Sequence, residues 1–260
     1  MNRELVTASG TTIATTRVGI ERPDGCEIIW GHGWGQTGSA LAPLAESLGR
    51  SASSLVIDFP GFGQSPQPPA VWGTSDYADA VAEWIRTLPP RRRIWIGHSF
   101  GCRVGVQLAA RHPELIAGMV LISAAGLPPR RKFTRRVQVW TRKWAFKTAK
   151  IFVPEGPARD RLRGRFGSAD YRAAGPMRAI LTGVVNENLT AEAASVNCPT
   201  LLIYGANDND TPPEMGRRYQ ALIARSELVV LEGFDHMSVI QQGRHQVAHL
   251  IQGFLERLCR

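Results

Sequence analysis

Six short apolar runs, none of which alternates with polar residues, constrain the fold of this 260-residue chain more than any other feature. Continuous runs of this length are typical of strands buried on both faces, as in parallel sheets. Segments with helical spacing lie between them, so the chain consists of repeated strand–helix units. The predicted strands are 26–30, 54–58, 93–97, 117–123, 199–204 and 228–232, and the predicted helices are 39–48, 76–87, 102–111, 213–224 and 239–258.

The two ends of this pattern complete the predicted organisation. Residues 4–18 alternate apolar and polar positions about Ser9-Gly10, which predicts a β-hairpin of two edge strands. The strand–helix alternation breaks between residues 126 and 195. We therefore expect an α/β fold with a mainly parallel eight-stranded sheet flanked by helices, a core formed by residues 1–125 and 196–260, and an inserted helical cap at 126–195. The chain has no run of 18 apolar residues, so we expect no transmembrane segment.

The positive charge of the chain is concentrated in the insert. The formal net charge is +9, yet residues 127–178 alone hold 15 basic and 3 acidic residues, which leaves the remainder slightly acidic. Within this segment, residues 133–151 have one apolar stripe that includes Trp140 and Trp144, and a basic opposite face. We interpret this segment as a cap helix whose tryptophans help to bind substrate.

Two other roles remain open for the basic face: docking an acidic carrier protein or a phosphate-bearing substrate, and contact with an anionic lipid surface. Nucleic acid is not expected, because the insert lacks an aromatic stacking platform and a base-reading motif.

The segment GHSFG at residues 97–101 joins a predicted strand directly to a predicted helix, which is the context that the pattern G-x-S-x-G requires. A sharp strand-to-helix turn crowds positions 97 and 101, so both must be small, and it exposes the hydroxyl of Ser99. The helix that follows adds its N-terminal dipole, which favours developing negative charge. Ser99 is therefore the candidate nucleophile.

A serine nucleophile needs a base within hydrogen-bond reach and a third group that orients the base. Asp208 directly follows the predicted strand 199–204, at the carboxyl edge of the sheet, where open α/β sheets bind ligands. His236 follows the next predicted strand and is the candidate base. Asp208 is the expected orienting acid, and Asp210, two residues further on, is the alternative.

The segment HGWG at residues 32–35 follows the first predicted strand of the parallel sheet. Its glycines let the backbone come close to a reacting carbonyl group. We expect an oxyanion hole formed by the backbone N–H groups of Trp34 and Phe100. The Trp34 indole is also a candidate wall of the substrate pocket.

HGWG, DFPGFGQS at 58–65, GHSFG, GAND at 205–208 and the late His236 together resemble the α/β-hydrolase superfamily of esterases and lipases. The order Ser99, Asp208, His236 is the order of the triad in that superfamily. The resemblance covers about residues 24–125 and 196–258, and the insert lies where the superfamily has its variable cap. Within the superfamily, HGWG and DFPGFGQS are most similar to the carboxylesterases that demethylate pimeloyl-acyl-carrier protein. This chain differs from many members of the superfamily directly after GHSFG, where Cys102 stands in place of a second glycine.

These features together predict a serine hydrolase that cleaves a carboxylic ester or thioester without a metal or an organic cofactor. Two alternatives remain: a non-catalytic binding protein of the same fold, and the same triad used for perhydrolase or carbon–carbon bond chemistry.

The four cysteines lie far apart, with no C-x-x-C pair, so we expect reduced structural thiols and no disulfide or zinc site. The N-terminal residues lack the apolar region of a secretory signal, which favours a cytoplasmic location.

Overall fold

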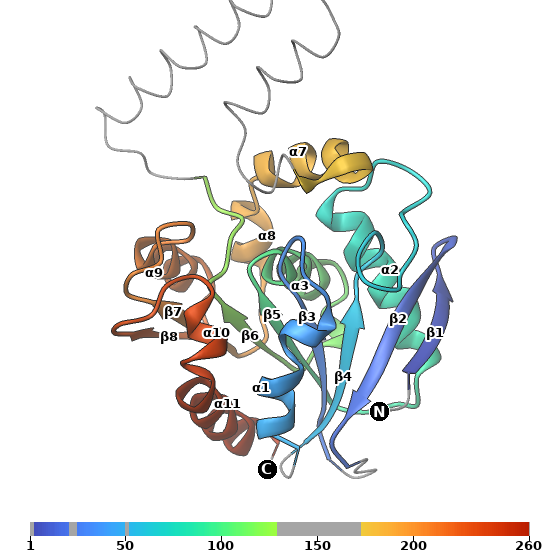
Figure 1. Ribbon diagram of the computed structural model, residues 1–260. Helices are drawn as coiled ribbons and strands as arrows, with labels where there is room; N and C mark the ends of the chain where they lie inside the picture. Colours follow the sequence, from blue (N-terminus) through green and yellow to red (C-terminus); the bar gives the residue numbers. More distant parts are fainter. Residues whose placement is uncertain (1–2, 21–24, 50–51, 129–172, 260) are drawn as a thin grey trace, which may run out of the picture.

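The computed structural model describes residues 3–20, 25–49, 52–128 and 173–259 (Figure 1). Its eight strands form a single sheet in the order β1-β2-β4-β3-β5-β6-β7-β8. β1 and β2 form the predicted antiparallel hairpin, β2 pairs antiparallel with β4, and all other pairs are parallel. The strands are β1 Arg3–Ala8, β2 Thr11–Val18, β3 Glu27–Gly31, β4 Ser53–Asp58, β5 Arg93–His98, β6 Gly118–Ile122, β7 Thr200–Gly205 and β8 Ser226–Leu231.

Successive side chains of the central strands enter two separate hydrophobic cores, one on each face of the sheet. In β5, Trp95 packs into one core, whereas Ile94 and Ile96 pack into the other. Both faces are therefore covered, which explains why these strands appear in the sequence as uninterrupted apolar runs. The predicted α/β fold with a mainly parallel eight-stranded sheet is confirmed.

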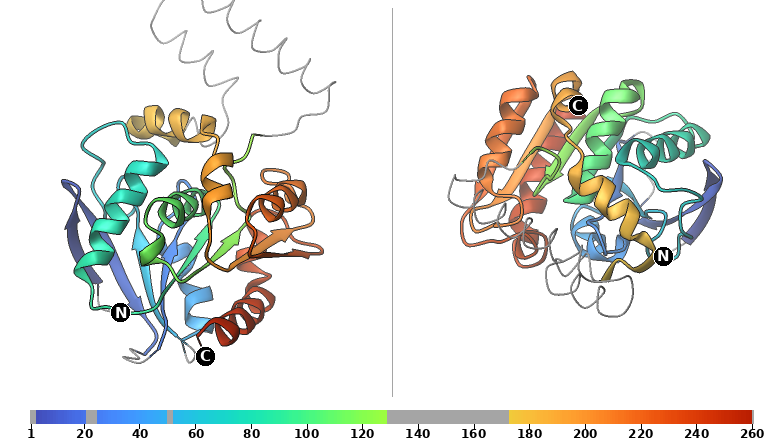
Figure 2. Two further views of the ribbon diagram at one scale, coloured as in Figure 1. Left: turned by 180° about the vertical axis from the view of Figure 1, so that it is seen from behind. Right: turned by 90° about the horizontal axis from the view of Figure 1, so that it is seen from above.

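Helices cover both faces of the sheet (Figure 2). Apolar residues of α2, α3, α8 and α9 contribute to one core, and those of α1, α10 and α11 contribute to the other. The described helices are η1 Gly38–Ala40, α1 Ala42–Ser47, α2 Thr74–Thr87, α3 Phe100–Arg111, η2 Pro113–Leu115, η3 Gly175–Met177, α7 Arg178–Asn186, α8 Thr190–Ser195, α9 Pro213–Leu222, α10 Ser238–Gln241 and α11 Arg244–Leu258.

Four local predictions need correction. The helix predicted over 39–48 is a short 3₁₀ helix, η1, followed by α1. β2 is not an edge strand, because it lies between β1 and β4. β8 is an edge strand whose residues are mostly half-buried, because it has a neighbour on only one side. The single helix predicted over 239–258 is two helices, α10 and α11, which are separated at Gln242 and Gly243.

The two ends of the predicted insert lie next to each other. The N–H of Leu189 donates a hydrogen bond to the carbonyl oxygen of Gly126 at 2.9 Å. α8 packs against α3 and α9, and α7 lies across the end of the molecule at which the parallel strands finish (Figure 1). The predicted amphipathic segment 133–151, with Trp140 and Trp144, lies outside the described residues. The division into core and cap stays a prediction.

The prediction that all four cysteines are reduced is wrong. Cys26, directly before β3, and Cys259, directly after α11, form a disulfide with a Cα–Cα distance of 6.2 Å. They are 233 residues apart in the sequence, so their spacing carried no signal, and only the packing of α11 against the sheet brings them together. Cys102 and Cys198 are free thiols.

Stable disulfides are typical of oxidising compartments and rare in the cytosol. The cytoplasmic location therefore stays a prediction. None of the helices in the described ranges is long and apolar enough to cross a membrane.

Candidate active site

Ser99 lies at the sharp turn between β5 and α3, as the sequence predicts. Its backbone angles, φ 50° and ψ −103°, are ones that residues other than glycine seldom adopt. A hydrogen bond to the neighbouring strand β6 holds this turn in place: the Ser99 N–H donates to the Ile122 carbonyl oxygen at 3.0 Å. Strain of this kind persists only where the surrounding structure enforces it, and it is common at active sites.

The two glycines of the turn have no room for a side chain. A Cβ atom on Gly97 would lie 2.5 Å from the backbone of Gly101. A Cβ atom on Gly101 would lie 2.0 Å from the carbonyl oxygen of Gly31, at the end of β3. The second contact brings the turn against the start of the HGWG loop. The predicted steric reason for small residues at both positions is therefore confirmed.

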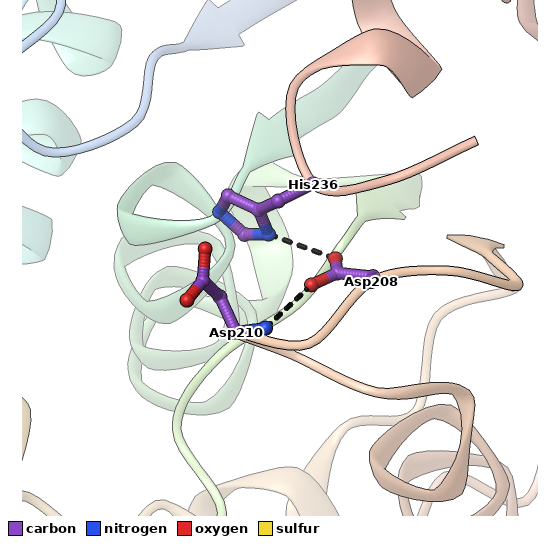
Figure 3. A group of neighbouring side chains, drawn as sticks. All are labelled: Asp208, Asp210 and His236. Atoms are coloured by element: carbon purple, nitrogen blue, oxygen red, sulfur yellow. Dashed lines mark hydrogen bonds and ion pairs between the residues drawn. The ribbon is translucent and has the colours of Figure 1, made fainter.

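His236 and Asp208 come together at the carboxyl edge of the sheet. His236 Nδ1 lies 2.8 Å from Asp208 Oδ2, and Figure 3 shows the imidazole ring facing that carboxylate. The Asp208 side chain is completely buried, whereas 17% of the His236 side-chain surface is exposed. A carboxylate oxygen only accepts, so His236 carries its proton on Nδ1 and leaves Nε2 free to act as a base.

Asp210 does not take this position. Its backbone N–H donates to Asp208 Oδ1 at 2.9 Å (Figure 3). Asp210 itself is exposed, whereas Asp208 is buried. Asp208, Asp210 and His236 each place one possible metal-ligand atom within 4.8 Å of the others. Because both oxygens of Asp208 already accept hydrogen bonds, we interpret the group as a hydrogen-bonded Asp208–His236 pair.

The pKa values of the pair shift in opposite directions. Burial alone would raise the pKa of Asp208, but hydrogen bonds from His236 and Thr211 outweigh burial and lower this pKa. Burial alone would lower the pKa of His236, but the hydrogen bond and charge of Asp208, aided by Asp210 and Asp235, raise it above 6.5. Each group therefore stabilises the charged form of the other.

No hydrogen bond joins the Ser99 hydroxyl to His236 within the described part of the chain. Hydrogen bonds between nucleophile and base are often loose in the absence of substrate.

The proposed oxyanion donors, Trp34 and Phe100, lie on the HGWG loop and in the first turn of α3. Neither N–H group donates a hydrogen bond to any other described residue. The first N–H groups of a helix have no intrahelical acceptor, so that of Phe100 is free by geometry. The Trp34 indole is half-buried and packs edge-on against Phe62 and Phe100, with ring-centroid distances of 4.9 and 5.5 Å.

His32, at the start of the HGWG loop, supports the loop. Its Nε2 accepts a hydrogen bond from the Phe59 N–H at 3.0 Å, and its Nδ1 donates to the Gly33 carbonyl oxygen at 2.7 Å. Burial lowers the pKa of His32 to about 4, so the ring is neutral and both bonds are kept near neutral pH. His32 therefore joins the HGWG loop to the chain after β4.

Asp58, the first residue of DFPGFGQS, supports the same region. Its carboxylate accepts hydrogen bonds from the N–H groups of Gly38 at 2.7 Å and Gln64 at 3.0 Å. A Cβ atom on Gly63 would lie 2.2 Å from this carboxylate. The HGWG and DFPGFGQS segments are thus joined by hydrogen bonds into one loop region beside Ser99.

The sequence matches the family described as alpha/beta hydrolase fold over residues 28–242. The chain belongs to this family. Within it, the chain is 28% identical to the pimeloyl-[acyl-carrier protein] methyl ester esterase of Chromobacterium violaceum, over 74% of this chain and 80% of the relative.

Two solved structures have the same fold as this chain. The esterase from Thermogutta terrifontis superimposes with a TM-score of 0.74 at 21% identity, and the match covers all of both chains. The enol-lactonase from Burkholderia xenovorans LB400 superimposes with a TM-score of 0.74 at 23% identity, over 97% of this chain and all of that one. The family match makes the chain a hydrolase of the α/β-hydrolase type, and the two solved structures bear on its fold alone.

Sequence reasoning missed Thr211, which holds Asp208 in the candidate site. The Thr211 N–H donates to Asp208 Oδ1 at 2.8 Å, and its hydroxyl lies 2.8 Å from Asp208 Oδ2 and 3.1 Å from the Ser123 carbonyl oxygen. Thr211 therefore binds both carboxylate oxygens. Its position three residues after Asp208, before a Pro-Pro pair, gave no signal of its own, because threonine is common in turns.

Proposed function

We propose that the chain is a serine hydrolase that cleaves a carboxylic ester or thioester through an acyl-enzyme on Ser99. The observation that carries the proposal is the hydrogen bond from His236 Nδ1 to the buried Asp208, at the sheet edge where the strained Ser99 turn lies. A weak serine nucleophile needs such an oriented base. The match to a pimeloyl-[acyl-carrier protein] methyl ester esterase supports ester chemistry.

In the proposed acylation step, His236 Nε2 takes the Ser99 proton as Ser99 Oγ attacks the substrate carbonyl carbon. The carbonyl oxygen becomes an oxyanion, and the free N–H groups of Trp34 and Phe100 donate to it. His236, now doubly protonated, is stabilised by the charge of Asp208. When the tetrahedral intermediate collapses, His236 returns the proton to the leaving alcohol or thiol.

In the proposed deacylation step, His236 removes a proton from water, and the hydroxide attacks the acyl-Ser99 carbonyl carbon. The same two N–H groups bind the second oxyanion. Collapse releases the carboxylic acid and returns the proton to Ser99 Oγ. This cycle needs no group beyond the side chains and the backbone of the chain and one water molecule.

The side chains next to the proposed oxyanion hole indicate the kind of substrate. The half-buried Trp34 and Phe62 next to the proposed oxyanion hole favour an apolar group in the substrate. An acidic carrier protein or an anionic lipid surface at the basic insert remains a prediction from the sequence.

Hydrolysis of p-nitrophenyl esters from acetate to laurate, with the wild type and Ser99→Ala side by side, tests the proposal. We expect turnover by the wild type and a loss of about 10³- to 10⁶-fold in kcat for Ser99→Ala. A fluorophosphonate probe should label the wild type at Ser99 and leave Ser99→Ala unlabelled.

Equal turnover by the two proteins would exclude the acyl-enzyme mechanism. A folded wild type that neither turns over esters nor reacts with the probe would favour a binding protein of the same fold.

A further inference from the structure

His98 occupies the variable position of G-x-S-x-G, directly before Ser99, and the proposed function gives it no task. Its side chain is completely buried at the end of β5. Its ring lies 4.9 Å from the ring of His236, at an angle of 45°. The two residues are 138 positions apart in the sequence, so the contact depends entirely on the fold.

The position of the proton on His98 follows from its partner. His98 Nε2 lies 3.0 Å from the backbone carbonyl oxygen of His236. A carbonyl oxygen only accepts, so Nε2 carries the proton and donates. His98 Nδ1 is buried and has no hydrogen-bond partner among the described residues. Burial, together with the nearby His236, lowers the pKa of His98 to about 3, so the ring is neutral and keeps one proton near neutral pH.

The loop that carries His236 joins β8 to α10 and spans residues 232–237. Its other hydrogen bonds lie mainly on the side of Asp208. The Asn207 N–H donates to the Phe234 carbonyl oxygen at 2.9 Å, which ties the loop to the segment after β7. Asp235 accepts hydrogen bonds from Met237 and Ser238, which fix the turn into α10. These bonds set His236 relative to Asp208, but they do not reach the strand that carries Ser99.

Among the described residues, two side-chain hydrogen bonds tie the loop to the nucleophile side. One is the His98 hydrogen bond from β5. The other is weaker: the Gln36 side-chain amide donates to Met237 Sδ at 3.1 Å, while its oxygen accepts from the Gly33 N–H. Of these two, only the His98 bond joins a neighbour of Ser99 to His236 itself.

We propose that His98 is a positioning residue that sets the distance between Ser99 and His236 through its hydrogen bond to the His236 carbonyl group. This role rests on the proposed function, in which a proton passes between Ser99 Oγ and His236 Nε2. A misplacement of about 1 Å can reduce the rate of such a step about 100-fold. Substrate binding does not involve this bond, so kcat changes and KM does not.

The test compares His98→Phe with His98→Gln. Phe keeps a planar ring but has no donor, whereas the Gln side-chain amide can place an N–H near the position of His98 Nε2. Turnover is measured per active site, with the labelled fraction counted by a fluorophosphonate probe.

We expect kcat per labelled site to fall about 10- to 100-fold for His98→Phe, with KM within about twofold of the wild type. His98→Gln should recover most of the loss.

Leu108→Ala is the matched control. Leu108 is also completely buried, in α3, but its apolar side chain makes no hydrogen bond to His236 or to the Ser99 turn. This variant should lower stability and leave turnover per labelled site unchanged. Wild-type turnover per site in His98→Phe, or equal losses in His98→Phe and His98→Gln, would overturn the positioning role.

A second measurement needs no variant to fold. Nitrogen NMR of the wild-type histidines should find one non-titrating ring with its proton on Nε2, and the signals of this ring should be assigned to His98. A proton on Nδ1, or titration between about pH 5 and 8, overturns the proposal. A wild type that neither hydrolyses esters nor labels at Ser99 would instead overturn the proposed function, and the positioning role with it.

Discussion

The edge at which the parallel strands end (the carboxyl edge) and the edge at which they begin (the amino edge) use buried polar residues in different ways. At the carboxyl edge, Ser99 is strained, His98 has an unpartnered ring nitrogen, and Asp208 is buried with His236. At the amino edge, Glu27 of β3 and Arg93 of β5 form a buried ion pair at 3.0 Å.

Other contacts at the amino edge also join separate parts of the chain. The Glu27 N–H donates to the Arg92 carbonyl oxygen, and the Cys26–Cys259 disulfide ties the start of β3 to the end of α11. The carboxyl edge therefore keeps strain and free donors that chemistry can use, whereas the amino edge is cross-linked. We expect changes at the first edge to affect activity and changes at the second to affect stability.

The largest expected effect separates the two aspartates of the carboxyl edge. Asp208→Asn should reduce kcat about 10³- to 10⁴-fold, because an amide can hold His236 in the wrong tautomer. For Asp210→Asn, kcat should stay within about threefold of the wild-type value, because only the backbone of Asp210 contacts Asp208. Steady-state kinetics on one p-nitrophenyl ester measures both.

The pH profile sharpens this test. The proposed base is neutral His236, whose pKa is raised, so kcat/KM should rise with pH through a value above 6.5. Asp210→Asn removes one of the charges that raise this pKa, so the acid limb should move slightly to lower pH. Equal losses of kcat in the two variants would contradict the assignment of Asp208.

At the amino edge, Glu27→Gln should leave kcat unchanged and lower the free energy of unfolding by about 3 to 5 kcal/mol, because Arg93 becomes an unpaired buried charge. Glu227→Gln in β8 is the control, because its ion pair with Arg257 is exposed and should contribute less than about 1 kcal/mol. Urea denaturation of both variants measures the difference. A loss of activity without a loss of stability in Glu27→Gln would remove the distinction between the edges.

Removing the disulfide with Cys26→Ser should lower the free energy of unfolding by about 2 to 4 kcal/mol, mainly because the unfolded chain gains freedom. Cys198→Ser is the control, since Cys198 is a free thiol. Thiol titration of the unfolded, unreduced wild type should find two of the four cysteines free. Four free thiols would show that the purified protein lacks the bond.

The smallest effect tests strain at the carboxyl edge. Ser99→Gly should raise the free energy of unfolding by about 1 kcal/mol while it abolishes ester hydrolysis, because glycine adopts the backbone angles of Ser99 without strain. Ser99→Ala, which keeps a Cβ atom, should show no such gain. Thermal denaturation compares the two variants, and equal stabilities would argue against stored strain at this turn.

Much of the fold and the candidate site could be predicted from the sequence because the signals are local. A strand buried on both faces is a continuous apolar run, and a sharp strand-to-helix turn needs Gly97 and Gly101. Asp208 and His236 follow their strands directly, so the parallel sheet brings them to one edge. The supporting residues gave no such signal. Thr211 is a residue type that is common in turns, and His98 acts through a contact with a segment 138 residues away.

The sequence by itself determined the parallel sheet, the position of Ser99 and the two strand ends from which Asp208 and His236 come, since each depends on residues close together in the chain. Only the tertiary structure decided between Asp208 and Asp210 as the partner of His236, joined Cys26 to Cys259, and placed His98 against the backbone of His236. Side-chain direction at a turn and contact between distant segments depend on how the elements pack, and a local pattern does not contain that information.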